Sequence, residues 1–373
     1  MSNELLFVGS LPCQTAEETF RTFGTEFGPY LAYLPDGEVG DRSYWNTFVA
    51  YKVLNGHPEI DLVRRPAPHA DGVENWKPRS RHDQFQFRVK PGVDKVRFGD
   101  PGWRLGYARD ALNSYALFKL LKQQNILAKH LRFQVCIPLT YSLTHYYFPP
   151  EDEPKIVPGL NGALRDEVKK LVELIPANEL AIQWDAVAEQ KLIEAELAAN
   201  NIESAKKTAL QVMEPAQEVC SVIPRDAALG YHTCFGTLDG WPSRSPQSLT
   251  GPVLLANAAI ECSDRPIDFF HIPTLGTASD EFFSPLSDLK ANGARIYMGA
   301  IHHLHGPGGM SAQLRTIKKY LPEFGLGGAC GFGRVPDHPG KIISEDGRVI
   351  PDYIETIQRD HKAALAELAK VAK

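Results

Sequence analysis

The sequence predicts an α/β fold, a single (β/α)8 TIM barrel with an insertion after the second strand and a helix after the eighth. Three observations predict this fold. Short apolar runs alternate with segments of helical spacing, the runs number eight, and polar residues follow the runs around the whole series. A doubly wound parallel sheet would give the same alternation, but the count of eight favours the barrel.

The predicted strands are short apolar runs bounded by turn residues. They are Leu5–Leu11, Tyr30–Leu34, Leu131–Leu139, Leu180–Trp184, Ala228–Cys234, Asp268–Ile272, Ala294–Ile301 and Gly325–Phe332. Between them, patterns such as L-R-D-E-V-K-K-L-V-E-L-I place apolar residues three or four positions apart, which predicts helices. A last helix is predicted from Tyr353 to about Val371.

One long segment fits neither the helical nor the strand period. Residues 66–107 are rich in Pro, Arg and Trp and follow the second predicted strand. We interpret them as an insertion that forms either a lid or a contact in a homo-oligomer. The chain of 373 residues is otherwise interpreted as one barrel domain spanning residues 1–373, because barrels often reach this length as one unit.

Composition excludes several classes of function. The formal net charge is −5, and acidic and basic residues are mixed along the chain, which argues against nucleic-acid binding and against a charged membrane surface. The N-terminal residues lack the pattern of a signal peptide, and the apolar runs are too short to cross a bilayer. Six thinly spread cysteines fit a reducing compartment, so we expect a cytoplasmic protein.

Three residues at predicted strand ends form a candidate metal site. His232 and Cys234 are two positions apart on the fifth strand, so their side chains share one face, and Cys330 ends the eighth strand. Zinc binds such mixed nitrogen and sulfur ligands, and catalytic zinc sites keep three protein ligands and one open position. The alternative is two buried cysteines beside a hydrogen-bonded histidine.

Further polar residues lie where a barrel carries its active site, at the carboxyl ends of the strands. The candidates for acid–base or other catalytic roles are Tyr141, Asp185, His302 and His305, and those for substrate binding are Ser10, Asp36, Glu38, Arg42, Gln183, Trp184, Glu189 and Arg334. Alternatives are open for several of them. Asp185 could cap a helix, Pro35-Asp36-Gly37 is an ordinary turn sequence, and the histidines could be solvated loop residues.

The motifs V-G-S-L-P, L-P-D-G-E-x-G-D-R, Q-W-D, H-x-C, H-H-x-H-G and C-G-x-G-R occur in strand order along the chain. In this, the chain resembles the catalytic half of cobalamin-independent methionine synthase and its shorter relatives, among them the epoxyalkane:coenzyme M transferase type. The resemblance implies a zinc ion at His232, Cys234 and Cys330 that holds a substrate thiol as thiolate. A glutamate completes the site in the synthases, whereas Pro273 aligns there and His271 is only a weak substitute.

These observations predict a zinc-dependent transferase that moves a methyl or alkyl group to or from sulfur, or a C–S lyase. Its partners would be a small-molecule thiol and an alkyl donor, or a thioether. One alternative is a metal-free barrel lyase similar to uroporphyrinogen decarboxylase. Others are a zinc hydrolase, which usually prefers histidine and carboxylate ligands, and a non-catalytic protein that binds thiol or zinc.

Overall fold

The computed structural model describes residues 4–80, 82–99, 102–238, 241–302, 306–333 and 351–372. Within them, eight parallel strands form one sheet in the order β1-β10-β9-β8-β7-β6-β5-β2. These strands are β1 (Leu5–Leu6), β2 (Tyr33–Pro35), β5 (Arg132–Pro138), β6 (Leu180–Ala186), β7 (Ala228–Thr233), β8 (Phe269–Pro273), β9 (Arg295–Ile301) and β10 (Gly325–Gly328). Each matches one predicted strand.

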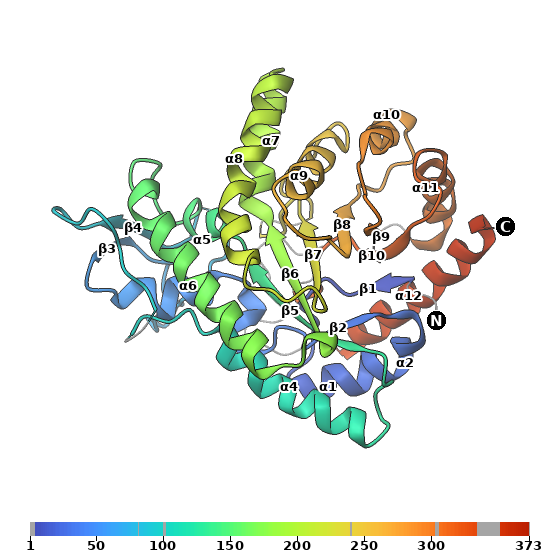
Figure 1. Cartoon of the computed structure of the whole chain (residues 1–373), viewed down its shortest axis with the longest axis horizontal. Coiled ribbons are helices and arrows are strands. Elements are labelled where there is room, and N and C mark those ends of the chain that lie inside the picture. Colours follow the sequence, from blue (N-terminus) through green and yellow to red (C-terminus); the bar gives the residue numbers. More distant parts are fainter. Residues whose placement is uncertain are drawn as a thin grey trace.

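The sheet curls until its two edge strands meet. Parallel bridges join Leu5 to Leu31 and Ser10 to Gly37, which connects the chain around β1 with the chain around β2. This arrangement, with helices around the sheet (Figure 1), confirms the predicted (β/α)8 barrel. The predicted first strand is longer than β1 because only residues 5 and 6 pair regularly with β10.

Helices cover the outside of the sheet and connect its strands (Figure 1). The longer helices are α4 (Tyr107–Gln123), α6 (Glu153–Leu174), α7 (Val187–Ala198), α8 (Ile202–Cys220), α9 (Thr250–Glu261), α11 (Gly306–Tyr320) and α12 (Pro351–Ala372). Shorter ones are α1 (Ala16–Thr19), α2 (Thr25–Phe27), α3 (Thr47–Lys52), α5 (Thr140–Thr144) and α10 (Asp280–Phe283). Helix α12, predicted from the sequence, reaches back to the N-terminal part, where Gln358 and Lys362 contact Glu26. None of the helices in the described ranges is long and apolar enough to span a bilayer.

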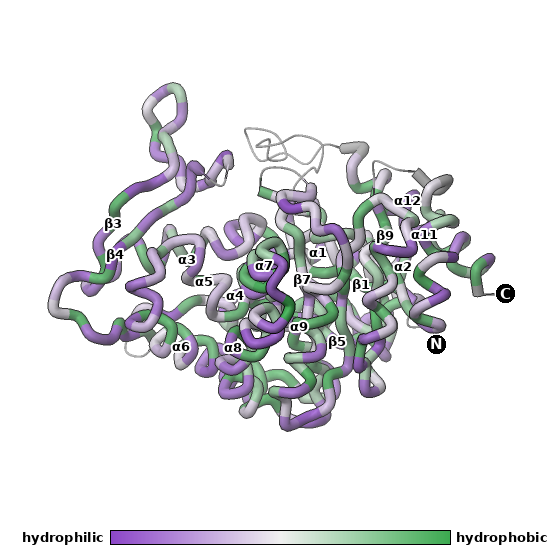
Figure 2. The backbone as a smooth tube through the Cα atoms, turned by 90° about the horizontal axis from the view of Figure 1, so that it is seen from above, coloured by the Kyte–Doolittle hydropathy of each residue, from purple (hydrophilic) through white to green (hydrophobic). Residues whose placement is uncertain are grey.

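The chain between β2 and α4 forms an antiparallel ribbon, β3 (Ile60–Arg64) and β4 (Gln86–Val89), which extends to one side of the barrel (Figures 1 and 2). Phe85 and Phe87 are buried and stack with ring centroids 5.8 Å apart, which fixes the base of the ribbon to the core. Strand β3 precedes residue 66, where the predicted insertion starts. Helix α4 begins at Tyr107.

Apolar side chains fill the amino-terminal half of the barrel interior. Leu6, Tyr33 and Phe269 belong to a separate buried cluster there, and the rings of Tyr33 and Phe269 stack with centroids 4.7 Å apart. Gly230 makes room for this packing, since a Cβ atom on it would lie 2.3 Å from the Phe269 ring. The half of the interior at the amino ends of the strands is thus filled by apolar side chains. Functional groups of the interior therefore gather at the carboxyl ends of the strands, which we call the upper half.

Candidate functional site

The upper half of the barrel interior is polar because alternate residues of a strand face inward. Strand β6 points Gln183 and Asp185 inward, and the next strand, β7, points His232 inward. Asp185 pairs in register with His232, and His232 pairs in register with His271 of β8. One carboxylate and two imidazoles therefore lie side by side in one layer of the barrel.

The three predicted metal ligands lie together at this end of the barrel, and we call them the ligand cluster (His232, Cys234 and Cys330). The Sγ atoms of Cys234 and Cys330 are 3.2 Å apart, and Cys330 Sγ lies 3.9 Å from His232 Nε2. All three donor atoms lie within 4.8 Å of one another. His232 and Cys234 are buried, and Cys330 is partly exposed, as expected for a site with one open side.

The ligand cluster fits zinc by its chemistry and its dimensions. Zinc accepts thiolate and imidazole ligands at about 2.3 Å and about 2.0–2.1 Å, so two ligands of a tetrahedral ion lie about 3.5–3.8 Å apart. The distance from Cys330 Sγ to His232 Nε2 lies within a few tenths of an ångström of this range, and the two Sγ atoms lie about half an ångström closer than around a tetrahedral ion. Among the described residues this is the group of histidine, cysteine and carboxylate side chains close enough to hold a metal ion.

The electrostatics of the cluster favour the metal-binding form of its sulfur. A hydrogen bond with Cys330 lowers the pKa of the Cys234 thiol, and so do the hydrogen bond and the charge of His232. Together they hold this pKa well below its ordinary value, although burial raises it. The backbone N–H of Gly236 also donates to this sulfur, at 3.2 Å. Burial opposes a charge on His232, but Cys234 and Asp185 outweigh it and raise the pKa of His232. A thiolate is the form of cysteine that binds metals.

His271 contacts the ligand cluster but is not part of it. Its Nδ1 lies 2.8 Å from His232 Nδ1, and its Nε2 lies 2.8 Å from the carbonyl oxygen of Gly328. Complete burial and the neighbouring His232 lower the pKa of His271 well below its ordinary value, so it is neutral. His271, the weakly predicted fourth ligand, therefore contacts His232 at Nδ1 and does not join the ligand cluster.

A cavity of about 330 Å³ opens above the ligand cluster. Its polar lining includes Ser10, Glu38, Trp45, His82, His145, Tyr146, Asp185, Lys191 and Arg244 as well as the ligand cluster. Three of the predicted substrate or catalytic residues, Ser10, Glu38 and Asp185, thus face the same space as the predicted metal ligands. His82 comes from the insertion, which therefore contributes to the wall of the cavity.

Asp185 is held in the cavity wall by two side-chain donors. Gln183 Nε2 donates to Oδ1 at 2.9 Å, and Trp45 Nε1 donates to Oδ2 at 3.1 Å. Burial nevertheless raises the pKa of Asp185 above its ordinary value. Trp45 has a positive φ of 50°, which is strained for a large side chain and is typical of functional sites. Nothing in the sequence around residue 45 indicates this role.

Asp185 does not cap α7, so the alternative that its position in the sequence leaves open does not apply. The hydroxyl oxygen of Ser142 accepts hydrogen bonds from the N–H groups of Val187 and Ala188 instead. The same hydroxyl donates to Glu189 Oε2 at 2.6 Å, and the Ser142 N–H donates to Oε1 at 3.1 Å. Glu189 is completely buried by these contacts and does not line the cavity.

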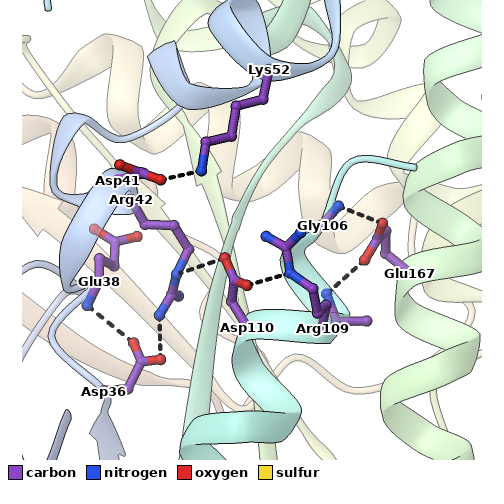
Figure 3. Close-up of polar contacts among 10 residues, drawn as sticks. Asp36, Glu38, Asp41, Arg42, Lys52, Gly106, Arg109, Asp110 and Glu167 are labelled. Atoms are coloured by element: carbon purple, nitrogen blue, oxygen red, sulfur yellow. Dashed lines mark hydrogen bonds and ion pairs between the residues drawn. The ribbon is translucent and has the colours of Figure 1, made fainter. Parts of the chain in front are cut away.

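Asp36 and Arg42, predicted to bind substrate, belong to a charge network outside the cavity (Figure 3). We use this name for Asp36, Asp41, Arg42, Lys52 and Asp110. Arg42 binds Asp36, its Nε lies 3.9 Å from Asp110 Oδ2, and Lys52 pairs with Asp41. Asp36 Oδ1 also accepts from the N–H of Glu38 at 3.0 Å, so the network fixes the loop that carries Glu38 into the cavity.

Of the remaining predicted residues, those that the structure describes do not line the cavity. Trp184 is completely buried in the main core, since it faces the other side of β6 from Asp185. Tyr141 packs against the core, and His302 lies 3.2 Å from Thr274 Oγ1, measured from Nε2. Gln183 does not line the cavity but donates a hydrogen bond to Asp185, which does. His305 and Arg334 lie outside the described residues.

Tyr146 and Arg244 line the cavity and were missed by the sequence analysis. Arg244 donates to the carbonyl oxygen of Cys234 at 2.8 Å, which ties it to the ligand cluster. Burial raises the pKa of Tyr146 to about 12, although Arg244 opposes this. Both residues follow strand ends, Tyr146 after β5 and Arg244 after β7, so their distance from the strand hid them. A count of polar residues directly at strand ends cannot find them.

Comparisons with known proteins bear on the fold. No family model and no curated protein matches the chain. A Listeria monocytogenes protein assigned as a vitamin B12-independent methionine synthase aligns with a TM-score of 0.50 and 13% identity, over 94% of this chain and 86% of its own. Fructose-bisphosphate aldolase of Plasmodium falciparum has a TM-score of 0.33 and 10% identity, over 95% of this chain and 82% of its own. The carboxyl transferase domain of Rhizobium etli pyruvate carboxylase has a TM-score of 0.32 and 10% identity, over 88% of this chain and 58% of its own. The chain thus shares its fold with a methionine synthase-like protein.

Proposed function

We propose that this protein is a zinc-dependent transferase that activates a small-molecule thiol and moves a methyl or alkyl group to or from its sulfur. The observation that carries the proposal is the convergence of His232, Cys234 and Cys330 below a cavity of about 330 Å³. The similarity in fold to a methionine synthase-like protein supports it. The donor set also favours it over a zinc hydrolase, because two cysteine ligands weaken the Lewis acidity that activates water.

Zinc held by these three residues would lower the pKa of a bound thiol, which is mostly protonated at neutral pH when free. The residues of the chain would supply the rest. Asp185 and Glu38 would bind polar groups of the substrate and orient its sulfur. As the sulfur bonds to the alkyl carbon, the bond to the leaving atom breaks with its electron pair, and that atom takes a proton. His82, His145 and Tyr146 line the cavity and are the candidates for this proton transfer.

The first test is the zinc content of the purified protein, measured by elemental analysis. We expect about one zinc per chain in the wild type and almost none in Cys234→Ala or Cys330→Ala. Cys136→Ala is the matched control, because Cys136 is also buried inside the barrel but lies outside the ligand cluster. A zinc-free wild type would leave the metal-free lyase as the better explanation.

The second test separates a transferase from a protein that only stores zinc. In cobalt-substituted protein, a thiol that enters the open position adds a sulfur-to-cobalt charge-transfer band to the absorption spectrum. We expect small thiols to produce this band. We also expect thiols supplied with an alkyl donor, or thioethers, to be converted to product. Zinc binding without any effect of thiols on the cobalt spectrum would contradict the proposal.

A further inference from the structure

Between the ligand cluster and β10 runs a chain of two hydrogen bonds that passes through His271. The first joins His232 Nδ1 to His271 Nδ1, and the second joins His271 Nε2 to Gly328 O, each over 2.8 Å. The two imidazole rings lie with centroids 4.7 Å apart and are tilted by 51°. His271 is completely buried, so water does not compete for these contacts.

The chemistry of the last acceptor fixes the positions of the hydrogens. A carbonyl oxygen can only accept, so His271 Nε2 must carry a hydrogen, and the Nδ1 of a neutral imidazole then carries a lone pair. That lone pair can accept only if His232 has its hydrogen on Nδ1. In the neutral, metal-binding form of His232 the lone pair is then on Nε2, and Nε2 is the nitrogen that lies 3.9 Å from Cys330 Sγ.

We propose that His271 is a positioning residue that holds His232 in the Nδ1–H tautomer and so presents Nε2 as the metal ligand. This inference rests on the proposed metal site. It also explains how ligands that come from two separate strands keep their positions relative to one another. Gly328 lies two residues before Cys330, so the hydrogen-bond chain that orients His232 ends on the segment that carries the second sulfur.

The barrel is shaped to let His271 reach that far. In the sheet, β9 separates β8 from β10, so the imidazole must cross over β9 to meet Gly328. Gly299 of β9 leaves the space, because a Cβ atom there would lie 2.9 Å from His271 Nε2. Gly327 of β10 does the same, since its Cβ atom would lie 3.1 Å from His271 Cδ2. Thr233 Oγ1 donates to the His271 carbonyl at 3.2 Å and ties the two strands together.

Two substitutions separate the effect of the His271 hydrogen bonds from the effect of its side-chain volume. His271→Phe keeps a ring of similar size but removes both hydrogen bonds, and His271→Asn keeps an oxygen close to the position of Nδ1 that can accept from His232. We expect the zinc affinity, measured by competition with a chromophoric chelator, to fall about 10- to 100-fold in His271→Phe. In His271→Asn most of the affinity should be retained.

The matched control is His57→Phe. His57 is also buried, its Nε2 lies 2.8 Å from the Arg97 carbonyl, and its Nδ1 accepts from the Glu59 N–H at 3.2 Å. It therefore has the same pattern of hydrogen bonds, but it lies just before β3 and is not part of the ligand cluster. His57→Phe should lower thermal stability and leave the zinc affinity unchanged, which separates a general loss of stability from a specific effect on the metal site.

The tautomer itself is measurable by ¹H–¹⁵N NMR of the imidazole nitrogens of His232. In wild-type protein we expect hydrogen on Nδ1, both without metal and with zinc on Nε2, and in metal-free His271→Phe we expect a mixture of tautomers. Zinc bound to Nδ1, or equal affinity and equal tautomer populations in His271→Phe and wild type, would overturn the inference. A wild type that binds no zinc would instead overturn the proposed function, and the metal-free spectra would still test the tautomer.

Discussion

The ligand cluster and the charge network both lie where strands of the barrel end, yet their electrostatics are opposite. In the charge network, Arg42 is 7% exposed and Asp36 is 4% exposed, and each neutralises the other. In the ligand cluster, His232, Cys234 and Cys330 bring donor atoms together that suit a cation. The comparison teaches that polar residues at strand ends can either neutralise one another or bring together donor atoms of the kind that suit a cation.

The first prediction breaks the charge network. Arg42→Met removes the cation and leaves the Asp36 carboxylate buried without its partner, so the free energy of unfolding should fall by about 3–5 kcal/mol. Chemical denaturation measures this change. Arg109→Met is the control, because Arg109 also pairs with Asp110 but is 65% exposed, and it should have a small effect. The Arg42→Met protein that still folds should keep its zinc, and loss of zinc would contradict the separation of the two regions.

The second prediction empties the ligand cluster. A metal that binds only the folded chain stabilises it by about 2.7 kcal/mol at 100 times the dissociation constant and by about 4.1 kcal/mol at 1,000 times. Chelation should therefore lower the thermal midpoint of the wild type, and added zinc should restore it. Cys234→Ala should show no such response. A midpoint that is independent of zinc in both proteins would show that the cluster is only core packing.

The third prediction concerns Glu189, a buried carboxylate whose hydrogen-bond partners on Ser142 are neutral. At pH 5 the protonated carboxyl has one hydrogen, and Glu189→Gln replaces it by an amide with two. An N–H group is then left against a Ser142 donor, so the change should cost about 1–3 kcal/mol. Denaturant titrations of both proteins between pH 5 and pH 8 measure this cost and its change with pH.

The pH dependence has a definite sign. Burial raises the pKa of Glu189 from 4.5 to about 7, so the folded chain keeps this proton longer than the unfolded chain does. The stability linked to it is complete below about pH 4.5 and is lost as the pH rises to about 7. The difference between wild type and Glu189→Gln should therefore shrink with rising pH. A difference that grows would mean that the Ser142 hydrogen bonds outweigh burial.

The smallest effect is expected at the exposed end of the charge network. Lys52 pairs with Asp41, and the two side chains are 42% and 48% exposed. Lys52→Ala should change the free energy of unfolding by about 0–1 kcal/mol, and by less at high salt, because solvent and ions screen the pair. An effect as large as that of Arg42→Met would show that the network acts as one unit rather than as a buried and an exposed part.

The fold could be predicted well because the necessary information is local. Each apolar run became a strand of the barrel, and the last helix begins within two residues of its predicted start. The antiparallel ribbon of β3 and β4 was less predictable. Strand β3 has four exposed residues among its five, so its sequence shows no buried face that would mark it as a strand. Its pairing with β4 across a long connection depends on tertiary structure.

Two pairs of aromatic residues show why the site was only partly predictable. Tyr141 and Trp184 stand close to strand ends in the sequence, whereas Tyr146 and Trp45 line the cavity. Tyr141 lies in α5 and packs against the core, and Trp184 faces outward from β6. Distance from a strand end along the chain is therefore a poor guide, since a loop can turn a later residue back over the barrel. The roles of all these residues in catalysis stay predictions.

The sequence by itself determined which side chains share a face. His232 and Cys234 had to point the same way because a strand has a period of two residues, whatever the rest of the chain does. The tertiary structure alone decided which partner each polar group meets. Trp45 and Asp185 are 140 residues apart and His271 and Gly328 are 57 apart, and both pairs form only because the barrel closes. Hydrogen bonds and ion pairs depend on distances through space, and those distances are set only when all eight strands are in place.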